Sequence, residues 1–177
     1  MTGRSRRQDG TAAAASYTLP VDVLLLYTRP GSHGVELLVG LRQGGYAPST
    51  WDTPSGKLQP GERLEDAMAR EAWEEVGLRL PPHLLQVVAM THWHPPDRVP
   101  RIGVFFHLKA DPAAHGVPRI AEPDKCAALQ WAPLDALPTP LLRYTEIGVD
   151  LFRSGRPYAA TDWPTSRAPD AGADEGG

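Results

Sequence analysis

The chain has 177 residues, an apolar fraction of 41% and a formal net charge of −3 at neutral pH, which is typical of one soluble globular domain with a sizeable core. The acidic balance argues against a basic surface for nucleic acid, and the single cysteine, Cys126, excludes an internal disulfide framework or a cysteine-based zinc cluster. The longest apolar run, Val23–Tyr27, is far shorter than the roughly 20 residues that span a bilayer, so we expect a cytoplasmic protein with no membrane or nucleic-acid partner.

The composition changes at both ends of the chain. Residues 1–16 are small, polar and basic, and residues 164–177 are mainly Ala, Gly, Pro and Asp. Neither segment can bury enough apolar surface to offset the entropy lost on ordering. We therefore predict two flexible tails around one domain, residues 17–163.

Strands dominate the first half of that domain. Val21–Thr28 and Val35–Arg42 are rich in Val and Leu, and a loop over Arg29–Gly34 separates them, so they are predicted to form a hairpin or to lie side by side. Trp51–Pro54 is predicted to be a short extended piece, because Pro54 biases the residue before it away from helix. A glycine-rich loop is predicted over Ser55–Gly61.

The second half begins with the strongest helix of the chain, predicted over Leu64–Val76 with Gly77 as its C-terminal stop. A last helix is predicted over Leu141–Phe152. Three further strands are predicted between the two helices: Leu84–His94, Ile102–Leu108 and Ala128–Trp131. Strands mixed with only two or three helices indicate a layered α/β or α+β domain.

The first helix carries acidic residues on its apolar side. On a helical wheel, Glu71 and Glu75 fall in the middle of one broad side, and Glu74 falls at its edge. An amphipathic helix that faces a core should not place ionised carboxylates there, because their burial without partners costs several kcal/mol. The apolar residues that share this side are Leu64, Ala67, Met68, Ala72 and Leu78.

Three explanations compete for these carboxylates. They can form the solvated acidic face of a surface helix, or they can form ion pairs, since Arg70 lies four residues before Glu74. They can also bind a hard divalent cation such as Mg²⁺, which prefers clustered carboxylate oxygens. One arginine cannot neutralise three carboxylates, and the apolar residues on the same side favour the cation. Glu62 lies about two turns before Arg70 and is placed to hold its guanidinium in a bidentate fork.

These residues also fit a known pattern. Gly56, five residues, Glu62, seven residues, and then the run from Arg70 to Leu78 match the Nudix box at every specified position. The chain therefore resembles the Nudix hydrolases, and Glu122–Pro138 is similar to the C-terminal half of the branch that hydrolyses nucleoside triphosphates. One departure is Ser55, where the family often has glycine.

The resemblance implies an α/β/α sandwich with a mixed sheet, and hydrolysis of a diphosphate linkage with Mg²⁺, or with Mn²⁺ in its place. Glu74 and Glu75 would be the principal metal ligands, and Glu71 would be a further ligand or would help to deprotonate the attacking water. The other box residues would support this centre: Arg70 and Glu62 would orient the carboxylates, and a backbone carbonyl of Ser55 or Gly56 would complete the coordination shell.

Candidate substrate contacts are sought among residues that the box pattern does not specify, and most have an alternative without function. Lys57 and Arg101 are candidate phosphate contacts or simply exposed cations, and Glu122 either adds a distant carboxylate to the site or lies in a solvated loop. His92 and His94 alternate along a predicted strand and share a face from which they would touch phosphate or a base. Trp131 either stacks on a base or is buried in its strand.

The leading hypothesis is a pyrophosphohydrolase of nucleoside or deoxynucleoside triphosphates that releases the monophosphate and pyrophosphate. A second hypothesis keeps the mechanism but takes a nucleotide sugar, ADP-ribose or a non-nucleotide diphosphate as substrate. A third is a non-catalytic ligand-binding domain, which would be expected to lose the box carboxylates. A homodimer is also expected as a possible state, because dimers are common in the resembled family.

Overall fold

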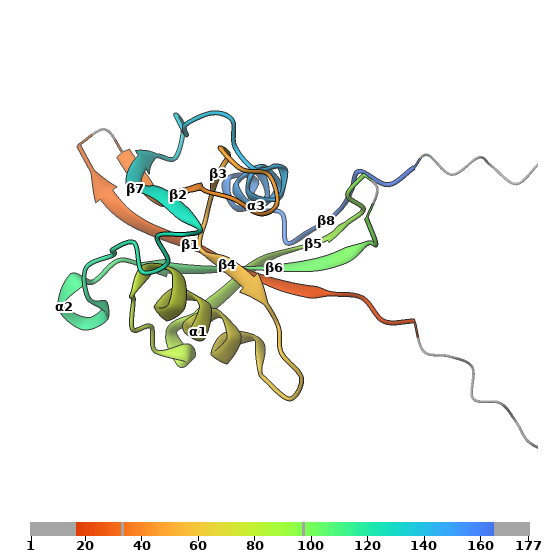
Figure 1. Ribbon diagram of the computed structural model, residues 1–177, viewed down its shortest axis with the longest axis horizontal. Helices are drawn as coiled ribbons and strands as arrows, with labels where there is room; N and C mark the ends of the chain where they lie inside the picture. Colours follow the sequence, from red (N-terminus) through yellow and green to blue (C-terminus); the bar gives the residue numbers. More distant parts are fainter. Residues whose placement is uncertain (1–16, 33, 97, 165–177) are drawn as a thin grey trace, which may run out of the picture.

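The computed structural model of the chain describes residues 17–32, 34–96 and 98–164 (Figure 1). The predicted tails, residues 1–16 and 164–177, lie outside the described residues apart from Pro164. Within the described part, no helix is long and apolar enough to cross a membrane. The elements in chain order are β1 (Val21–Gly31), β2 (Gly34–Arg42), β3 (Trp51–Asp52), β4 (Ser55–Lys57), α1 (Leu64–Val76), the 3-10 turn η1 (Pro82–Leu84), β5 (Gln86–Trp93), β6 (Arg101–Lys109), α2 (Pro112–His115), β7 (Cys126–Pro133), α3 (Arg143–Ser154) and β8 (Tyr158–Thr161).

The strands form one mixed sheet in the order β3-β2-β1-β6-β5-β8, with β4 added to β1 and β7 added to β2. The pairs β1–β6 and β5–β8 are parallel, and the other pairs are antiparallel. The predicted pairing of the first two strands is confirmed, because Thr28 lies opposite Leu37 and Gly31 lies opposite Gly34.

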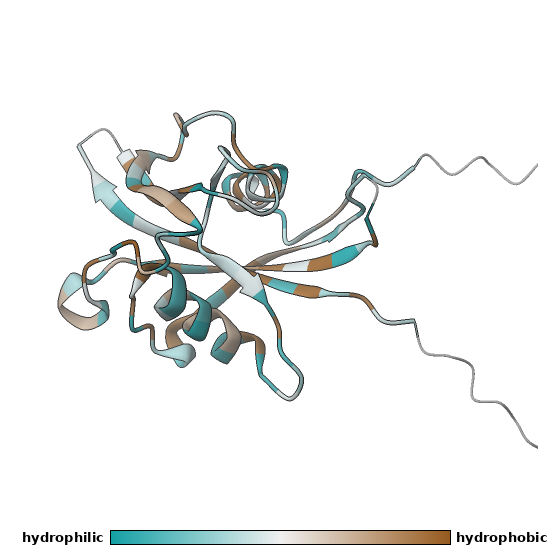
Figure 2. Cartoon of the chain, in the orientation of Figure 1, coloured by the Kyte–Doolittle hydropathy of each residue, from teal (hydrophilic) through white to brown (hydrophobic). Residues whose placement is uncertain are grey.

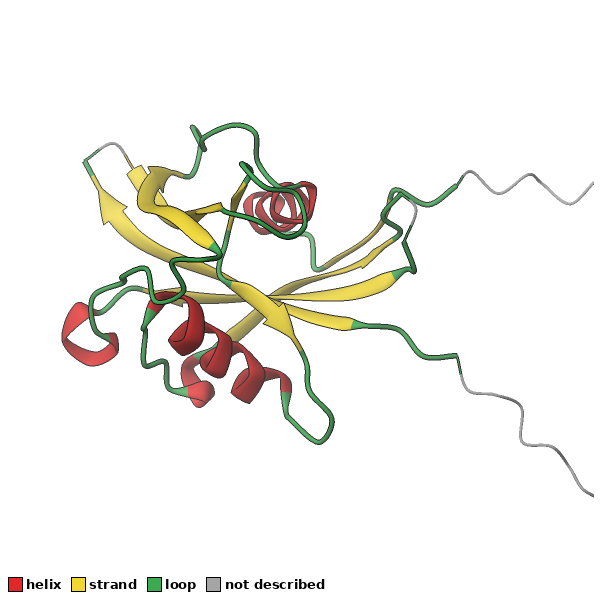
Figure 3. Ribbon diagram, in the orientation of Figure 1, coloured by secondary structure: helices red, strands yellow, loops and turns green. Residues whose placement is uncertain are grey.

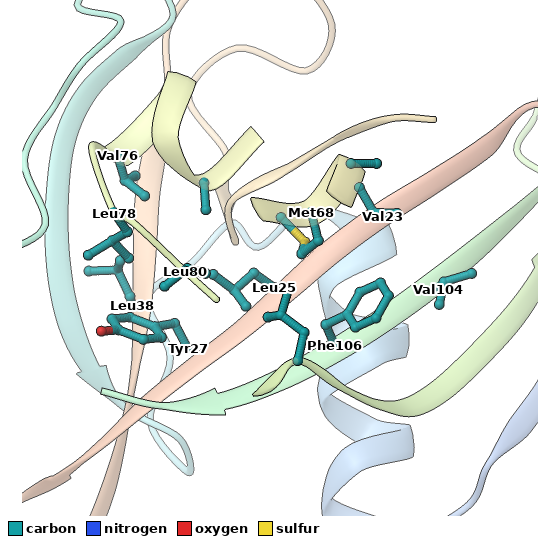
Figure 4. Packing of buried hydrophobic residues seen from close by; sticks show 13 residues of the cluster. Val23, Leu25, Tyr27, Leu38, Met68, Val76, Leu78, Leu80, Val104 and Phe106 are labelled. Atoms are coloured by element: carbon teal, nitrogen blue, oxygen red, sulfur yellow. The ribbon is translucent and has the colours of Figure 1, made fainter. Parts of the chain in front are cut away.

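Two helices cover opposite faces of this sheet (Figure 3). Successive side chains of β1 alternate between them: Val23, Leu25 and Tyr27 pack in the cluster that includes α1, whereas Leu24 and Leu26 pack in the cluster that includes α3. Figure 4 shows the first cluster around the strand, with Met68 and Val76 descending from α1. The expected α/β/α sandwich is confirmed.

The edge of β1 is divided between two partners. β4 pairs with its first part, Asp22–Leu24, and β2 pairs with its last part, Thr28–Gly31. Between them the backbone N–H of Leu25 donates to the carbonyl of Pro54 at 2.9 Å. The sheet therefore forks at this point, and the segment that joins the two branches passes beside α1.

The predicted bounds of α1 are confirmed, and Gly77 ends the helix in the left-handed region at φ 67°. The charged faces of the helix remain visible as teal segments between hydrophobic ones in Figure 2. The predicted loop Ser55–Gly61 is wrong in its first part, because Ser55–Lys57 pairs with the otherwise free edge of β1 as strand β4.

Other boundaries differ where tertiary contacts decide them. β5 begins at Gln86 rather than Leu84, because Pro82–Leu84 forms a 3-10 turn, and α3 begins at Arg143 rather than Leu141 and extends to Ser154. The sequence did not reveal two short elements, α2 and β8. The four residues of β8 carry no strong periodicity and are held by parallel pairing with β5.

Gly148 allows α3 to approach the sheet closely, and this gives a test of the packing. A Cβ atom at this position would lie 2.1 Å from Cε1 of Phe105, so Gly148→Ala should lower the free energy of unfolding by about 1–3 kcal/mol, although alanine is the better helix former. Urea unfolding would measure this. Asp150→Ala, on the exposed side of α3, is the control, and a Gly148→Ala variant as stable as the parent would contradict the close packing.

Candidate active site

Helix α1 places Glu71 directly against strand β4. A Cβ atom at Gly56 would lie 1.8 Å from Cδ of Glu71, so the Glu71 carboxyl group occupies the space that any larger residue in this strand would fill. Only 14% of the Glu71 side chain is exposed. Burial raises the pKa of Glu71, and the neighbouring charge of Glu74 raises it further, while Arg70 opposes both effects.

Arg70 organises the carboxylates around it. Its Nε and Nη2 atoms donate to the two oxygens of Glu62 at 2.8 and 3.0 Å, so the bidentate fork expected from the spacing is present. Its Nη1 atom donates to Glu71 at 2.7 Å and to Glu74 at 3.2 Å, and Nη2 also donates to the carbonyl of Lys57 at 3.1 Å. These hydrogen bonds from Arg70 lower the pKa of Glu62.

Glu75 is held differently from the other box carboxylates. The backbone N–H of Ser55 donates to its Oε2 atom at 2.9 Å, which ties the last turn of α1 to β4. Burial raises the pKa of Glu75 to about 8, and the negative charges of Asp52, Glu71 and Glu122 contribute to the rise. Burial therefore favours the protonated form of Glu75 when no cation is bound.

Asp52 is a buried carboxylate near Glu75, and the sequence analysis did not single it out. Arg42 Nη1 donates to Asp52 Oδ2 at 2.8 Å, and the hydroxyl of Thr145 on α3 donates to the other oxygen. Burial raises the pKa of Asp52, although both partners oppose the rise. The sequence does show an acidic residue between Trp51 and Thr53, just before the box. It could not show that this residue is buried against Thr145, which lies 93 residues away along the chain.

Two cavities meet at these residues. The first cavity, of about 280 Å³, extends from Gly40–Gly45 to the segment around Glu122 and Cys126. The second cavity, of about 270 Å³, extends along β4 toward α3. Arg42, Asp52 and Glu75 line both cavities, so Glu75 lies at their junction, where a ligand can extend to either side.

The structure brings some of the predicted substrate residues to this junction. Lys57 and Arg101 line the second cavity, and Glu122 lines the first, where Lys125 Nζ lies 2.7 Å from Glu122 Oε1. Among the residues that the sequence did not single out, the second cavity also includes Asp22, Arg42, Tyr46, Arg98 and Tyr144.

The other predicted substrate residues lie elsewhere. The rings of His92 and His94 contact Trp163, with centroid distances of 4.5 and 5.1 Å, and Trp131 packs between Tyr27 and Arg29. None of His92, His94 and Trp131 lines either cavity. His92 on β5 and His94 just after it thus lie together, as expected, beside Trp163; their contact with substrate remains a prediction.

The donor set suits a hard divalent cation. Within residues 17–32, 34–96 and 98–164, no three acidic, histidine or cysteine side chains already converge as a coordination shell. Glu71 and Glu74 each accept a hydrogen bond from Arg70 through one oxygen, while burial raises the pKa of Glu75. A cation would relieve the mutual repulsion of these groups and replace the Glu75 proton, and oxygen ligands of this kind fit Mg²⁺ or Mn²⁺.

Comparison with known proteins gives consistent matches. The family model described as "NUDIX domain" matches residues 18–152. Phosphatase NudJ of Escherichia coli strain K12 is 26% identical over 125 residues, which cover 66% of this chain and 78% of that protein. The crystal structure of a MutT NUDIX hydrolase from Burkholderia pseudomallei is similar with a TM-score of 0.66 and 27% identity, over 76% of this chain and 98% of that one.

A more distant structure supports the fold alone. The NUDIX domain of Shewanella oneidensis NrtR, solved with ADP ribose, has a TM-score of 0.65 and 17% identity, over 79% of this chain and 90% of that one. Its ligand is a property of that protein.

The raised pKa of Glu75 predicts a pH dependence of stability in metal-free buffer. The folded-state pKa of about 8 exceeds the ordinary value of 4.5, so between these values the folded state binds more protons than the unfolded state. Stability should therefore fall as pH rises from about 5 to 8, with a contribution from Glu75 of at most ~1.4 kcal/mol per pH unit.

Urea unfolding with chelator at several pH values would measure this slope. Glu75→Gln should flatten it and should be more stable than the parent protein at pH 8. Because Asp52 and Glu71 also titrate, the difference between parent and variant isolates Glu75. Parallel curves for the two proteins would show that Glu75 ionises normally.

Proposed function

The match over residues 18–152 shows that the chain belongs to the Nudix family, and we propose that this Nudix pyrophosphohydrolase acts on a nucleoside or deoxynucleoside triphosphate. The proposed reaction uses Mg²⁺ and releases the monophosphate and pyrophosphate. The observation that carries the proposal is the placement of the box carboxylates: Arg70 holds Glu71 and Glu74, and the backbone amide of Ser55 on β4 holds Glu75. Such a cluster is costly in a domain that has no cation to bind.

In the proposed site Glu71, Glu74 and Glu75 hold the cation, with a backbone carbonyl of Ser55 or Gly56. A bound divalent cation supplies neutralisation of the diphosphate charge and lowers the pKa of a coordinated water. Glu71 would be a further ligand of the cation or would help to deprotonate the attacking water, and its carboxyl group is fixed between Arg70 and Gly56.

The remaining box residues act as supports. Glu62 holds Arg70 through two hydrogen bonds, and Arg70 in turn fixes one oxygen of Glu71 and one of Glu74. These two carboxylates are thereby held in a defined arrangement. Preorganisation of this kind reduces the cost of assembling the charged site during reaction.

A second candidate keeps the chemistry and changes the substrate to ADP-ribose or a nucleotide sugar. It is favoured by two structural relatives, the NrtR domain solved with ADP ribose and a bifunctional NMN adenylyltransferase/ADP ribose pyrophosphatase from Francisella tularensis, which has a TM-score of 0.58 at 20% identity. A non-catalytic binding domain is disfavoured, because all three box carboxylates are retained.

Removal of metal is the direct test of cation dependence. Incubation with chelator should abolish hydrolysis of nucleoside triphosphates, and added Mg²⁺ should restore it, with Mn²⁺ as a substitute. Anion-exchange chromatography of the products should show monophosphate and pyrophosphate in equal amounts. Full turnover in metal-free buffer would overturn the assignment, and release of inorganic phosphate alone would point to a different scissile bond.

Glu75→Gln tests the role of the buried carboxylate, because it keeps the size of the side chain and removes its charge. If Glu75 holds the cation, kcat should fall at least ~10²-fold, which corresponds to about 2.7 kcal/mol of lost transition-state stabilisation. Asp150→Asn, an exposed position on α3, is the matched control and should change kcat little. Near-normal kcat for Glu75→Gln at saturating Mg²⁺ and substrate would contradict the role given to this residue.

A further inference from the structure

The second cavity has a basic wall. Four cationic and three acidic side chains line this cavity, so cations outnumber acids. Two of the cations are already paired, Arg42 with Asp52 and Arg101 with Asp22. The cationic residues are Arg42, Lys57, Arg98 and Arg101, and the acidic residues are Asp22, Asp52 and Glu75.

The other two cations are not neutralised in the same way. Lys57 and Arg98 form no ion pair with another residue of the described part of the chain. The lining of the cavity therefore has one more cationic than acidic side chain, and two of its cations are unpaired, which suits an anionic ligand.

The first cavity has the opposite balance. Four acidic side chains line it, Asp52, Glu75, Glu122 and Asp124, against the two cations Arg42 and Lys125. The sign of the lining charge thus changes across Glu75, where the two cavities meet. An anionic chain that passes the box carboxylates is accordingly favoured to extend into the second cavity.

Arg101 is held rigidly in the wall of the second cavity. Its Nη2 atom donates to Asp22 Oδ1 at 3.1 Å, and its Nε atom lies against the other oxygen of the same carboxylate. Only 15% of the Arg101 side chain and 10% of the Asp22 side chain are exposed. This two-point contact with Asp22 fixes the plane of the Arg101 guanidinium and leaves Nη1 without a partner among the described residues. The Nη1 atom is therefore preorganised to donate a hydrogen bond to a ligand.

Arg98 is also positioned, although it is exposed. Its guanidinium carbon lies 3.9 Å from the centroid of the Tyr46 ring. The carbonyl of Tyr46 in turn accepts a hydrogen bond from Arg42 Nε at 3.0 Å. The contact joins two loops that are far apart in the sequence and directs a second arginine to the same cavity as Arg101.

We propose that Arg98 and Arg101 are specificity-determining residues that bind the terminal phosphate of the triphosphate, so that the enzyme selects a triphosphate chain over a diphosphate that ends in a neutral sugar. The inference rests on the proposed function. Asp22 acts as a positioning residue, because it fixes the guanidinium of Arg101.

The test compares a nucleoside triphosphate with a nucleoside diphosphate sugar of the same base, in the presence of Mg²⁺. For Arg98→Gln and Arg101→Gln, KM for the triphosphate should rise at least ~10-fold with kcat changed by less than about 3-fold, because the lost contacts do not touch the reacting atoms. KM for the nucleotide sugar should change by less than about 2-fold. Equal losses on both substrates, or no loss on the triphosphate, would overturn the inference.

The control variant is Arg79→Gln. Arg79 also lies over an aromatic ring, 4.9 Å from the centroid of Trp73, but it lines neither cavity. It should leave both KM values unchanged. Arg101→Gln leaves Asp22 buried without its partner, so the melting temperatures of the variants are compared first. If Arg101→Gln unfolds, Arg98→Gln decides the result, because it removes an exposed side chain.

Binding of a non-hydrolysable, methylene-bridged triphosphate analogue, measured by calorimetry, separates this inference from the proposed function. The dissociation constant should rise at least ~10-fold in Arg98→Gln and stay unchanged in Arg79→Gln. If the parent protein hydrolyses no triphosphate yet shows this pattern, the proposed function is wrong and the basic wall remains an anion site. If the parent hydrolyses triphosphates and Arg98→Gln binds the analogue normally, the inference alone is wrong.

Discussion

The crowding of carboxyl groups between α1 and β4 is the constraint on which the site depends. Glu71 fills the space beside Gly56, and Glu75 is bound by the amide of Ser55, so both acids are fixed against a strand rather than directed to solvent. Such burial is unfavourable for charged groups. Arg70 offsets it for Glu71, whereas Glu75 offsets it by keeping its proton. In the metal-free protein the burial of these proposed ligands is therefore unfavourable, and a bound cation would offset that cost.

The fork in the sheet makes that arrangement possible. Because β2 and β4 share the edge of β1, the connection between them lies next to the last turns of α1 and carries Asp52 into the interior. Thr145 reaches Asp52 from α3 and Arg42 reaches it from β2, so a helix and the sheet both contribute to one buried group. The same fork leaves the space for the two cavities, whose charge differs on the two sides of Glu75.

Much of the fold and of the box could be predicted because the signals are local. The strands of the first hairpin and the bounds of α1 follow from periodicity and from Gly77, and the pair of Glu62 with Arg70 follows from two turns of spacing. The short strands β4 and β8 could not be predicted in the same way. Their few residues have no pattern of their own and are extended because a partner strand offers free backbone groups.

The sequence by itself determined the chemistry of the site: which acids lie on one side of a helix, which arginine accompanies them and which glycine precedes them. Only the tertiary structure decided which distant side chains join that site. Arg101 was expected and does so, Asp52 was not expected and does so, and His92 lies against Trp163 instead. The physical reason is that helical spacing fixes neighbours within a few residues, whereas contacts such as that of Asp52 with Thr145, 93 residues apart, depend on how the strands are ordered in the sheet.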